Sequence, residues 1–310
     1  MKKDFKFSVV IVTYNRLELL KECLENVINQ NKKFDEIIII NNCSTDGTDK
    51  YLSKIKDDCD ILNIYTTEKN IGGAGGFSLG VTKVDNNMDY VLLIDDDAML
   101  DPCFLKNIYD EIEESIFAYS GPVLVNGNVD TSHRRNLVNS ILMQKKDVKI
   151  DEYSSSSFLY DLSTFCGLMV STEVIHKIGL PLKEYFIWYD DTEYSMRVIK
   201  YTKIKNVNSA IIYHKTTIDE NKRLNWKSYY GYRNAIDMGK RHSRFALIYT
   251  SYRYIYHLYR WIYYKVKSFR KSENQAYFIF CSRLNLDVIK DSKAHRLGIN
   301  KYYYPGKVVE

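Results

Sequence analysis

The stretch "DYVLLIDDDAML", residues 89–100, decides how this chain folds. Four apolar residues in a row, 91–94, predict a strand that is buried on both faces. Three carboxylates, Asp95, Asp96 and Asp97, follow it directly. Like charges at neighbouring positions repel one another, and a buried strand beside them strengthens the repulsion. We therefore expect a positively charged partner at the end of this strand.

The chain on either side of this stretch repeats one pattern. Apolar runs at 7–13 ("FSVVIVT"), 36–40 and 61–66 predict three further strands, and helical periodicity fills the intervals at 17–24 and 49–56. Strands that alternate with helices at this spacing predict βαβ units and a mostly parallel sheet. The breaks after the strands are polar or glycine-rich and lie at 13–16, 41–48, 70–77 and 95–97. Because ligands bind at the carboxyl ends of such strands, we expect these breaks to converge on one rim.

The pattern predicts two domains. Residues 1–225 carry the alternating strands and helices, so we expect an α/β domain with a mostly parallel sheet flanked by helices. Residues 226–310 are rich in Tyr, Lys and Arg and predict a helical C-terminal region. Between the strand-like runs, residues 137–158, which include "SSSS", predict an exposed loop of low order.

Composition limits the class of protein. The chain has 310 residues, of which 45% are apolar and 27% charged, and this balance is typical of a soluble globular protein. The sequence contains no apolar run long enough to span a bilayer and starts without a signal-peptide core, so we expect a cytoplasmic location. The six cysteines include no CxxC pair and are expected to be free thiols. The net charge of +5 is concentrated in the tail while the rim is acidic, which argues against nucleic acid as a partner.

The carboxylate triplet suggests metal chemistry. Side chains alternate along an extended chain, so Asp95 and Asp97 are expected on one side and Asp96 on the other. Two carboxylates spaced in this way can chelate a hard divalent cation, although a solvated acidic turn explains the same residues. Phosphate oxygens would fill the open positions of such a cation, which points to a nucleotide diphosphate. The glycine run at 72–76 fits a backbone that approaches a ligand closely, and a flexible loop is its alternative interpretation.

Six motifs in order carry a family resemblance. They are "VVIVTYNR", "IIIINNCSTDGT", "NIGGAGGF", "LLIDDDA", "FIWYDDTEYSMR" and "AIIYHK", followed by "YYGYRN" at 229–234. In this order they resemble a family 2 glycosyltransferase with the GT-A fold over about residues 7–235. The combination of "NIGGAGGF" and "DDDA" is most similar to bacterial galactofuranosyltransferases, with rhamnosyltransferase-type relatives next.

The resemblance implies roles for the residues of the rim. Asp95, Asp97 and His214 would hold Mn²⁺ or Mg²⁺, although a half-buried histidine that ends a strand is an alternative for His214. Asn42 stands where many relatives have Asp, which leaves the identity of the bound base open. The residues implied in nucleotide binding are Thr13, Arg16, Asn42, Asp46, Asn70, Gly72, Gly73 and Asp96.

A second acidic segment is implied in catalysis. Inverting sugar transfer needs a base that takes the proton of the acceptor hydroxyl, and Asp191 matches the base of the family. Asp190 would orient the acceptor. Trp188, Tyr189 and Glu193 are implied in acceptor binding. Acidic residues also suit the positive end of a helix dipole, so a purely structural interpretation stands beside the catalytic one.

The resemblance thus predicts an inverting, metal-dependent glycosyltransferase. The predicted reaction moves galactofuranose from UDP-galactofuranose onto a cell-surface polysaccharide or a lipid-linked glycan. A rhamnosyltransferase that uses dTDP-rhamnose is the first alternative. A nucleotidyltransferase is a second, although "TYNR" after the first strand is a poor match to its glycine-rich loop. A metal-dependent sugar-binding module is the alternative that is not an enzyme.

The tail contains an amphipathic pattern at residues 244–271. At 100° per residue, Arg253, Arg260 and Lys267 fall in one sector, whereas Ile255, Ile262 and other apolar residues fall on the opposite face. Tyrosines and Trp261 lie on the flanks. This helix is expected either to lie on the inner face of the cell membrane or to pack on protein, including a second copy of the chain.

Overall fold

The computed structural model describes residues 4–56, 59–216 and 223–306, which form two compact units. The first unit contains the described residues of 1–136, 146–183 and 191–218. The second contains those of 137–145, 184–190 and 219–310. The chain therefore passes between the units several times, including once between Asp190 and Asp191.

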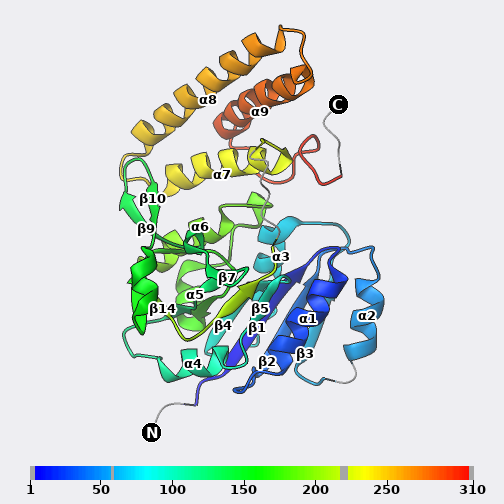
Figure 1. The fold of residues 1–310 in the computed structure, drawn as a ribbon, viewed down its shortest axis with the longest axis vertical. Coiled ribbons are helices and arrows are strands. Elements are labelled where there is room, and N and C mark those ends of the chain that lie inside the picture. Colours follow the sequence, from blue (N-terminus) through cyan, green and yellow to red (C-terminus); the bar gives the residue numbers. More distant parts are fainter. Residues whose placement is uncertain (1–3, 57–58, 217–222, 307–310) are drawn as a thin grey trace. The chain divides into compact units, whose positions relative to one another are not determined.

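An eight-stranded sheet forms the centre of the first unit (Figure 1). Its strands, in spatial order, are β11 (Ser157–Tyr160), β14 (Ile204–Val207), β6 (Ala118–Ser120), β13 (Leu168–Ser171), β4 (Tyr90–Asp95), β1 (Phe7–Thr13), β2 (Glu36–Asn41) and β3 (Leu62–Thr66). β4, β1, β2 and β3 are parallel to their neighbours in this group, and β13 joins β4 as an antiparallel strand. The expected mostly parallel α/β sheet is confirmed.

The apolar run of β1 is explained by two cores, one on each face of the sheet. Every residue of β1 is buried. Val9 and Ile11 belong to the core that also contains α1 (Leu17–Ile28), whereas Val10 and Val12 belong to the core on the α3 side (Gly72–Val81). Because successive side chains of a strand point to opposite faces, a strand covered on both faces must be apolar at every position.

Smaller elements complete the first unit. A four-stranded sheet has the order β5 (Ala98–Leu100), β15 (Ile212–His214), β7 (Val123–Val125) and β8 (Asn128–Val129). The helices are α2 (Thr48–Ile55), α4 (Phe104–Asp110), α5 (Thr172–Ile178) and α6, which runs through Asp190–Val198 and so begins at the last residue of a second-unit segment. Further short elements are β12 (Leu162–Ser163) and the 3₁₀ turns at Thr131–His133 and Ile150–Ser154, whereas the 3₁₀ turn at Lys183–Tyr185 begins at the last residue of a first-unit segment.

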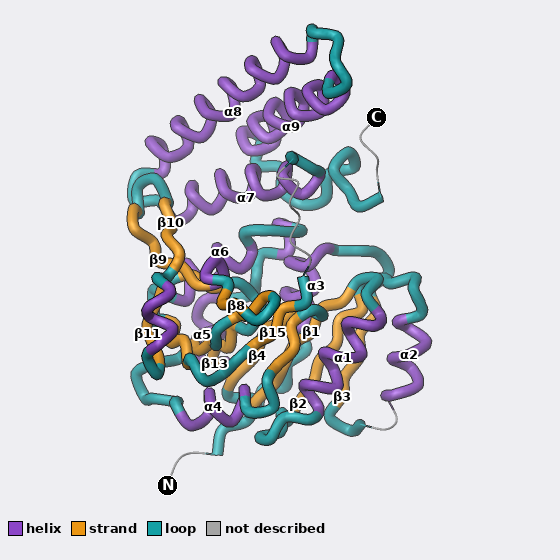
Figure 2. Tube along the Cα trace, in the orientation of Figure 1, coloured by secondary structure: helices purple, strands orange, loops and turns teal. Residues whose placement is uncertain are grey.

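The second unit is built from three helices, α7 (Trp226–His242), α8 (Ala246–Ser268) and α9 (Gln275–Lys293), drawn in purple in Figure 2. α7 begins at Trp226 because Asn225 and Ser228 form a reciprocal capping box. The core of the second unit is largely aromatic and includes Tyr229, Tyr230 and Phe280. The helical tail expected after residue 225 is therefore present, whereas the division into domains at residue 225 stays a prediction.

One local expectation and one alternative interpretation are wrong. Residues 137–158 are not a loop of low order, because this segment contains parts of β9 (Arg134–Asn139) and β11, with β10 (Gln144–Asp147) between them. β10 reads "QKKD" and carries no apolar signal that sequence patterns detect. The glycine run is not a loop either, because Gly72 begins α3 and most of the run is buried.

Candidate active site

The polar side chains that follow β1 and β4 meet directly. Thr13 Oγ1 donates a hydrogen bond to Asp96 Oδ2 at 2.7 Å. Arg16 Nη1 lies 2.6 Å from Asp97 Oδ2 and 3.2 Å from Asp96 Oδ1, so one guanidinium bridges two carboxylates. This cation is the partner that the repulsion within the triplet demands. The alternation expected for the triplet stops after Asp95, because Asp96 and Asp97 form the turn between β4 and β5.

Strand pairing brings His214 to the same turn. β15 runs antiparallel to β5 with His214 opposite Ala98, and the Lys215 N–H donates to the carbonyl of Asp97 at 2.8 Å. His214 Nε2 consequently lies 3.2 Å from Asp97 Oδ1. In the part of the chain that the structure describes, the buried Nδ1 of His214 has no hydrogen-bond partner. Two residues that are 117 positions apart thus share one site.

Burial and charge set the ionisation of this cluster. Burial, followed by the charges of Asp97 and Asp96, raises the pKa of Asp95 to about 7. Burial also raises the pKa of Asp96 to about 6, although Arg16 and the hydrogen bond from Thr13 oppose it. Burial acts on Asp97 in the same direction, but His214 and Arg16 outweigh it and hold the pKa of Asp97 below its usual value. A bound cation would stabilise the ionised forms of Asp95 and Asp96, whose pKa values are raised.

The donor set fits a divalent cation. Carboxylate oxygens with an imidazole nitrogen are ligands of Mn²⁺ and related ions. Asp97 and His214 already face each other, and no hydrogen bond to the carboxylate of Asp95 is found among the residues that the structure describes. Within those residues no three His, Cys, Asp or Glu side chains already converge on one point. A bound cation would thus add Asp95 as a third ligand to the existing pair of Asp97 and His214.

A second polar group lies between β2 and α3. The Oδ1 of Asn42 accepts from the Ile71 N–H at 2.8 Å, and its Nδ2 donates to Asn70 Oδ1 and to the carbonyl of Gly72, both at 3.1 Å. Asn70 Oδ1 also accepts from the Gly72 N–H at 2.8 Å. Asn42 is 2% exposed, so its amide is used within the protein. These bonds fix the chain at the start of α3.

The glycines of α3 have different surroundings. A Cβ on Gly76 would lie 2.5 Å from Val12, and one on Gly80 would lie 2.3 Å from Val10. These two glycines let α3 approach β1 closely. A Cβ on Gly73 would meet nothing within 4 Å, so its backbone faces open space.

The loops that follow β1 and β2 are tied to each other. Asp46 Oδ2 accepts from the N–H of Leu17 at 2.9 Å, and its Oδ1 accepts from Thr48 Oγ1 at 2.6 Å. Asn15, whose φ is +53°, accepts from the Thr45 N–H at 2.7 Å. Sequence analysis missed Asn15, although Asn is among the residues that most readily adopt this left-handed backbone.

Asp191 and Glu193 lie on α6 in the first unit and differ in their contacts. Asp191 Oδ1 accepts from the backbone N–H and the hydroxyl of Thr192, and the side chain is half-buried. Glu193 is buried; its two carboxylate oxygens share the N–H of Arg197 Nε at 3.1 Å, and Oε2 also accepts from Arg197 Nη2 at 2.8 Å. The carboxylate of Glu193 is therefore committed to an internal ion pair.

Trp188 and Tyr189 lie in the second unit and have left-handed backbones, with φ of +65° and +70°. Such values are strained for bulky residues and persist where the surroundings enforce them. Asn234 of α7 supplies that enforcement, because its Nδ2 donates to the carbonyls of Tyr185, Ile187 and Trp188 at 2.8–3.1 Å. The motif "YYGYRN" contains Asn234, but its residues alone do not indicate this role.

An aromatic pocket of about 440 Å³ lies beside this strained segment in the second unit. Trp188 forms part of its wall and packs so closely on Gly231 that a Cβ there would lie 2.7 Å from the indole. Asp190, the remaining residue of this segment with a predicted role, is buried. The pocket is lined by Trp188, Tyr189, Ser228, Gly231, Tyr232, Tyr252, Arg253 and Tyr256.

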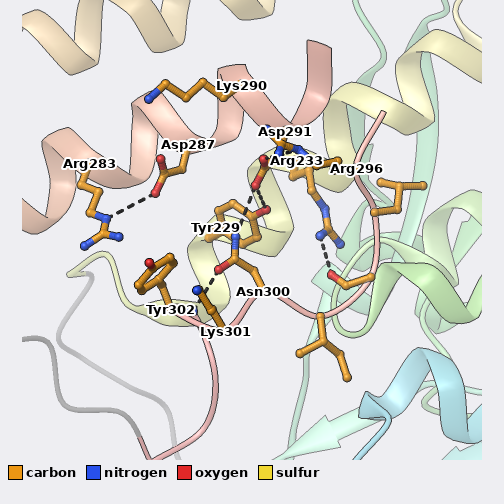
Figure 3. A pocket seen from close by; sticks show the side chains of 13 residues that line it. Tyr229, Arg233, Arg283, Asp287, Lys290, Asp291, Arg296, Asn300, Lys301 and Tyr302 are labelled. Carbon is orange, nitrogen blue, oxygen red and sulfur yellow. Dashed lines mark hydrogen bonds and ion pairs between the residues drawn. The ribbon is translucent and has the colours of Figure 1, made fainter. Parts of the chain in front are cut away.

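Another pocket of the second unit, of about 390 Å³, is lined mainly by charged residues (Figure 3). Arg283 lies 3.5 Å from Asp287, and Arg296 lies 3.1 Å from Asp291, which also accepts from Tyr229. Both carboxylates of this pocket are thus neutralised by neighbours. We assign it to the packing of the C-terminal segment on α9.

Comparison with known families shows which family the N-terminal half of the chain matches. The model of glycosyl transferase family 2 matches residues 8–167, which is about half of the chain. Galactofuranosyltransferase GlfT1 of Mycolicibacterium smegmatis is 27% identical over 202 residues. The match covers 62% of this chain and 64% of that relative, so about a third of the relative lies outside it. GlfT1 of Mycobacterium tuberculosis H37Rv is 26% identical over 196 residues, with the same two shares covered.

Solved structures agree on the fold. GalNAc-T7, crystallised with UDP, GalNAc and Mn²⁺, matches with a TM-score of 0.65 and 14% identity over 96% of this chain and 59% of that one. Residues 1–349 of TarS from S. aureus, in complex with UDP-GlcNAc, match with a TM-score of 0.55 and 15% identity over 98% of both chains. At these identities the likeness establishes the fold, which is GT-A.

Proposed function

Because the chain belongs to glycosyl transferase family 2, we propose that it transfers a sugar from a nucleoside diphosphate sugar to a glycan acceptor. One observation carries the proposal. Asp97 and His214 face each other at 3.2 Å beside Asp95, at the carboxyl end of a buried parallel strand. Burial and the acidic neighbours raise the pKa of Asp95, so its ionised form costs stability, and a bound diphosphate with its cation supplies a reason for it.

The proposed cation is Mn²⁺ or Mg²⁺, held by Asp95, Asp97 and His214. When bound, it neutralises the negative charge that develops on the departing diphosphate. Arg16 keeps Asp96 and Asp97 in place through its two short contacts, and Thr13 fixes Asp96 from the other side. We infer that Asp96, held in this way, contacts the ribose or the sugar of the donor.

Asp191 is the proposed base of an inverting transfer. The acceptor hydroxyl gives its proton to the carboxylate of Asp191 as its oxygen bonds to the anomeric carbon. The bond from that carbon to the phosphate oxygen breaks, and the nucleoside diphosphate leaves with the electron pair. Asp191 Oδ1 accepts from Thr192, which orients the carboxylate. Asp190 would orient the acceptor.

The nucleotide-binding residues divide into two kinds. Gly73 and the N–H groups at the start of α3 are proposed to contact the donor, because helix N-termini attract phosphate groups. Asn42, Asn70 and Gly72 hold that helix start through the bonds described above. We therefore propose Asn42 as a positioning residue instead of a direct ligand of the base. Asp46 likewise ties two loops together.

The proposed acceptor site contains Trp188 and Tyr189. Sugar rings pack their C–H faces on aromatic side chains, and the pocket beside these residues has aromatic walls. Glu193 has no part in this proposal, because its carboxylate pairs with Arg197.

The proposed donor is UDP-galactofuranose, supported by the names of the relatives from both mycobacteria. The acceptor would be a cell-surface polysaccharide or a lipid-linked glycan. A dTDP-rhamnose donor remains the alternative that the same site could accept.

A donor screen tests the function. The chain is incubated with Mn²⁺, a mixture of glycan acceptors and one of UDP-galactofuranose, dTDP-rhamnose or GDP-mannose, and products are identified by mass spectrometry. We expect an added hexose from the UDP donor. Transfer from dTDP-rhamnose alone would reassign the donor. Glycan binding without transfer or donor hydrolysis would mean that the protein is a sugar-binding module.

A further inference from the structure

The outward side of α8, which we call the outer face, is apolar and exposed. Leu247 is 81% exposed, Ile255 67% and Phe269 74%. The complete face comprises Leu247, Ile248, Tyr252, Ile255, Leu258, Tyr259, Ile262, Tyr263, Val266 and Phe269. It extends over the whole helix, which is about 35 Å long at the usual rise per residue. Continuous apolar surfaces of this size mark interaction sites.

The opposite side of α8 is polar and faces its own unit. His257 is fully buried and its Nδ1 lies 2.8 Å from Asn285 Oδ1 of α9. Arg260 donates to the hydroxyls of Tyr232 at 2.9 Å and Tyr256 at 2.7 Å. Rotating α8 to bury its outer face would expose or break these bonds. The exposure of the apolar residues is therefore built into the packing of the helix.

Charge identifies the kind of partner. Residues 244–271 contain no Asp or Glu and seven Lys or Arg side chains, of which Arg253 and Arg260 lie on the inward side beside His257 and Tyr232. Lys267 lies 4.6 Å from the ring of Tyr263, and Lys265 lies 5.4 Å from that of Phe269. Cations therefore border the outer face on both sides. The apolar residues of the outer face fit an apolar interior of the partner, and the cations at its edges fit negative charges on the surface of that partner.

A second copy of the chain fits this charge pattern poorly. In a symmetric dimer the same patch faces itself, so the cations of one helix would meet those of the other with no carboxylate between them. An anionic bilayer satisfies both halves of the pattern, because its headgroups attract Lys and Arg while its interface accepts apolar and tyrosine side chains. No helix of the described residues is long and apolar enough to cross a membrane, so the helix would lie along it.

We propose that the outer face of α8 binds the surface of a membrane that contains anionic lipids. Ile255, Ile262 and Val266 enter the boundary between headgroups and acyl chains, and the tyrosines lie at the headgroup level. Lys265 and Lys267 contact the lipid phosphates. This proposal concerns the second unit and does not depend on the sugar that the first unit transfers.

Vesicle flotation tests the proposal. The full chain is mixed with phosphatidylcholine vesicles, either pure or with about a third phosphatidylglycerol, at about 0.05 M and about 0.5 M salt. We expect binding to the mixed vesicles at low salt, with much weaker binding to the pure vesicles and at high salt. The absence of binding to mixed vesicles at low salt would overturn the proposal.

Matched variants distinguish binding through the outer face from non-specific adsorption to the vesicles. Ile255→Asp combined with Ile262→Asp should reduce binding at least about tenfold, because two apolar contacts are lost. Lys265→Glu combined with Lys267→Glu should remove the preference for the anionic vesicles. Leu159→Asp changes a side chain that is 54% exposed in the first unit and should bind like the unchanged protein. Unchanged flotation of the Ile255/Ile262 variant would reject the face.

Sedimentation velocity without vesicles tests whether a second copy of the chain binds the outer face instead. The proposal expects no association that depends on Ile255 and Ile262. If the unchanged protein forms a dimer that this variant abolishes, and neither floats with vesicles, the face is an interface between copies and the membrane proposal is wrong. Circular dichroism of each variant confirms that α8 is retained, which is expected because both residues are exposed.

Discussion

The sheet rim of the first unit and the outer face of α8 in the second break the usual rule of burial in opposite ways. At the rim, the carboxylate of Asp96 is buried, at 3% exposure, and burial raises its pKa. On α8, Ile255 and Val266 are exposed while Arg260 and His257 face the protein. Both arrangements cost stability in the isolated chain. We therefore propose that each marks a binding site, for a cation with its diphosphate at the rim and for a lipid surface at the helix.

The largest effect is expected for Asp191→Asn. Removing a general base lowers turnover by about 10²–10⁴-fold, while binding of the UDP donor should stay the same because the proposed role of Asp191 is to take the proton of the acceptor. Transfer kinetics and calorimetry on one protein sample separate the two effects. Asp151→Asn, on an exposed 3₁₀ turn of the same unit, is the control. Near-normal turnover of Asp191→Asn would remove Asp191 from the mechanism.

Asp95→Asn should separate function from stability. The buried carboxylate has a pKa of about 7 because of burial and its acidic neighbours, so replacing it with a neutral amide relieves repulsion. We expect a higher Tm near pH 8 together with at least about a 100-fold loss of UDP affinity in Mn²⁺. Thermal unfolding and calorimetry measure the two quantities. A lower Tm would show that Asp95 serves the fold instead of the ligand.

The two kinds of glycine in α3 provide the next comparison. A Cβ on Gly80 would lie 2.3 Å from Val10, so Gly80→Ala should lower the free energy of unfolding by about 1–3 kcal/mol. Gly73→Ala meets no neighbour and should leave that free energy equal or raise it by up to about 1 kcal/mol. Chemical denaturation of both variants measures the difference. Equal effects would contradict the close packing of α3 on β1.

The smallest effect concerns His257 of α8. Burial lowers the pKa of His257 to about 4, so its neutral form is favoured in the folded protein. Its contribution to stability is complete above the ordinary value of 6.5 and is lost as the pH falls towards 4. At about pH 5.5 the loss amounts to about 1 kcal/mol relative to neutral pH.

Denaturation at several pH values tests this contribution. His257→Gln should remove that part of the pH dependence, whereas His295→Gln, at an exposed position, should not. An identical slope for all three proteins would mean that His257 is not held neutral.

Sequence patterns predicted those elements that an apolar run defines. β1, β2 and β4 are buried on both faces, and their composition leaves no other interpretation. β10 and β14 were missed, because the first is polar and the second has four residues with a lysine and an asparagine. Such short strands owe their conformation to neighbours and not to their own residues.

Sequence motifs predicted which residues belong to the candidate site but not how these residues contact one another. The carboxylates and His214 could be named from sequence, whereas the bridge from Arg16 and the internal use of Asn42 depend on how loops meet. Asn234 belongs to a recognised motif, but its role could not be predicted, since it holds carbonyls of a segment 46–49 positions earlier. For α8, periodicity predicted the two faces but could not indicate which one turns inward.

Calorimetric titration of UDP, with and without Mn²⁺, tests the central claim most directly. The cluster of Asp95, Asp97 and His214 should bind UDP in the presence of Mn²⁺, and affinity should fall at least about 100-fold without the ion or in Asp97→Ala. UDP binding of equal strength with the metal, without it and in Asp97→Ala would contradict the account, as would the absence of binding under all conditions.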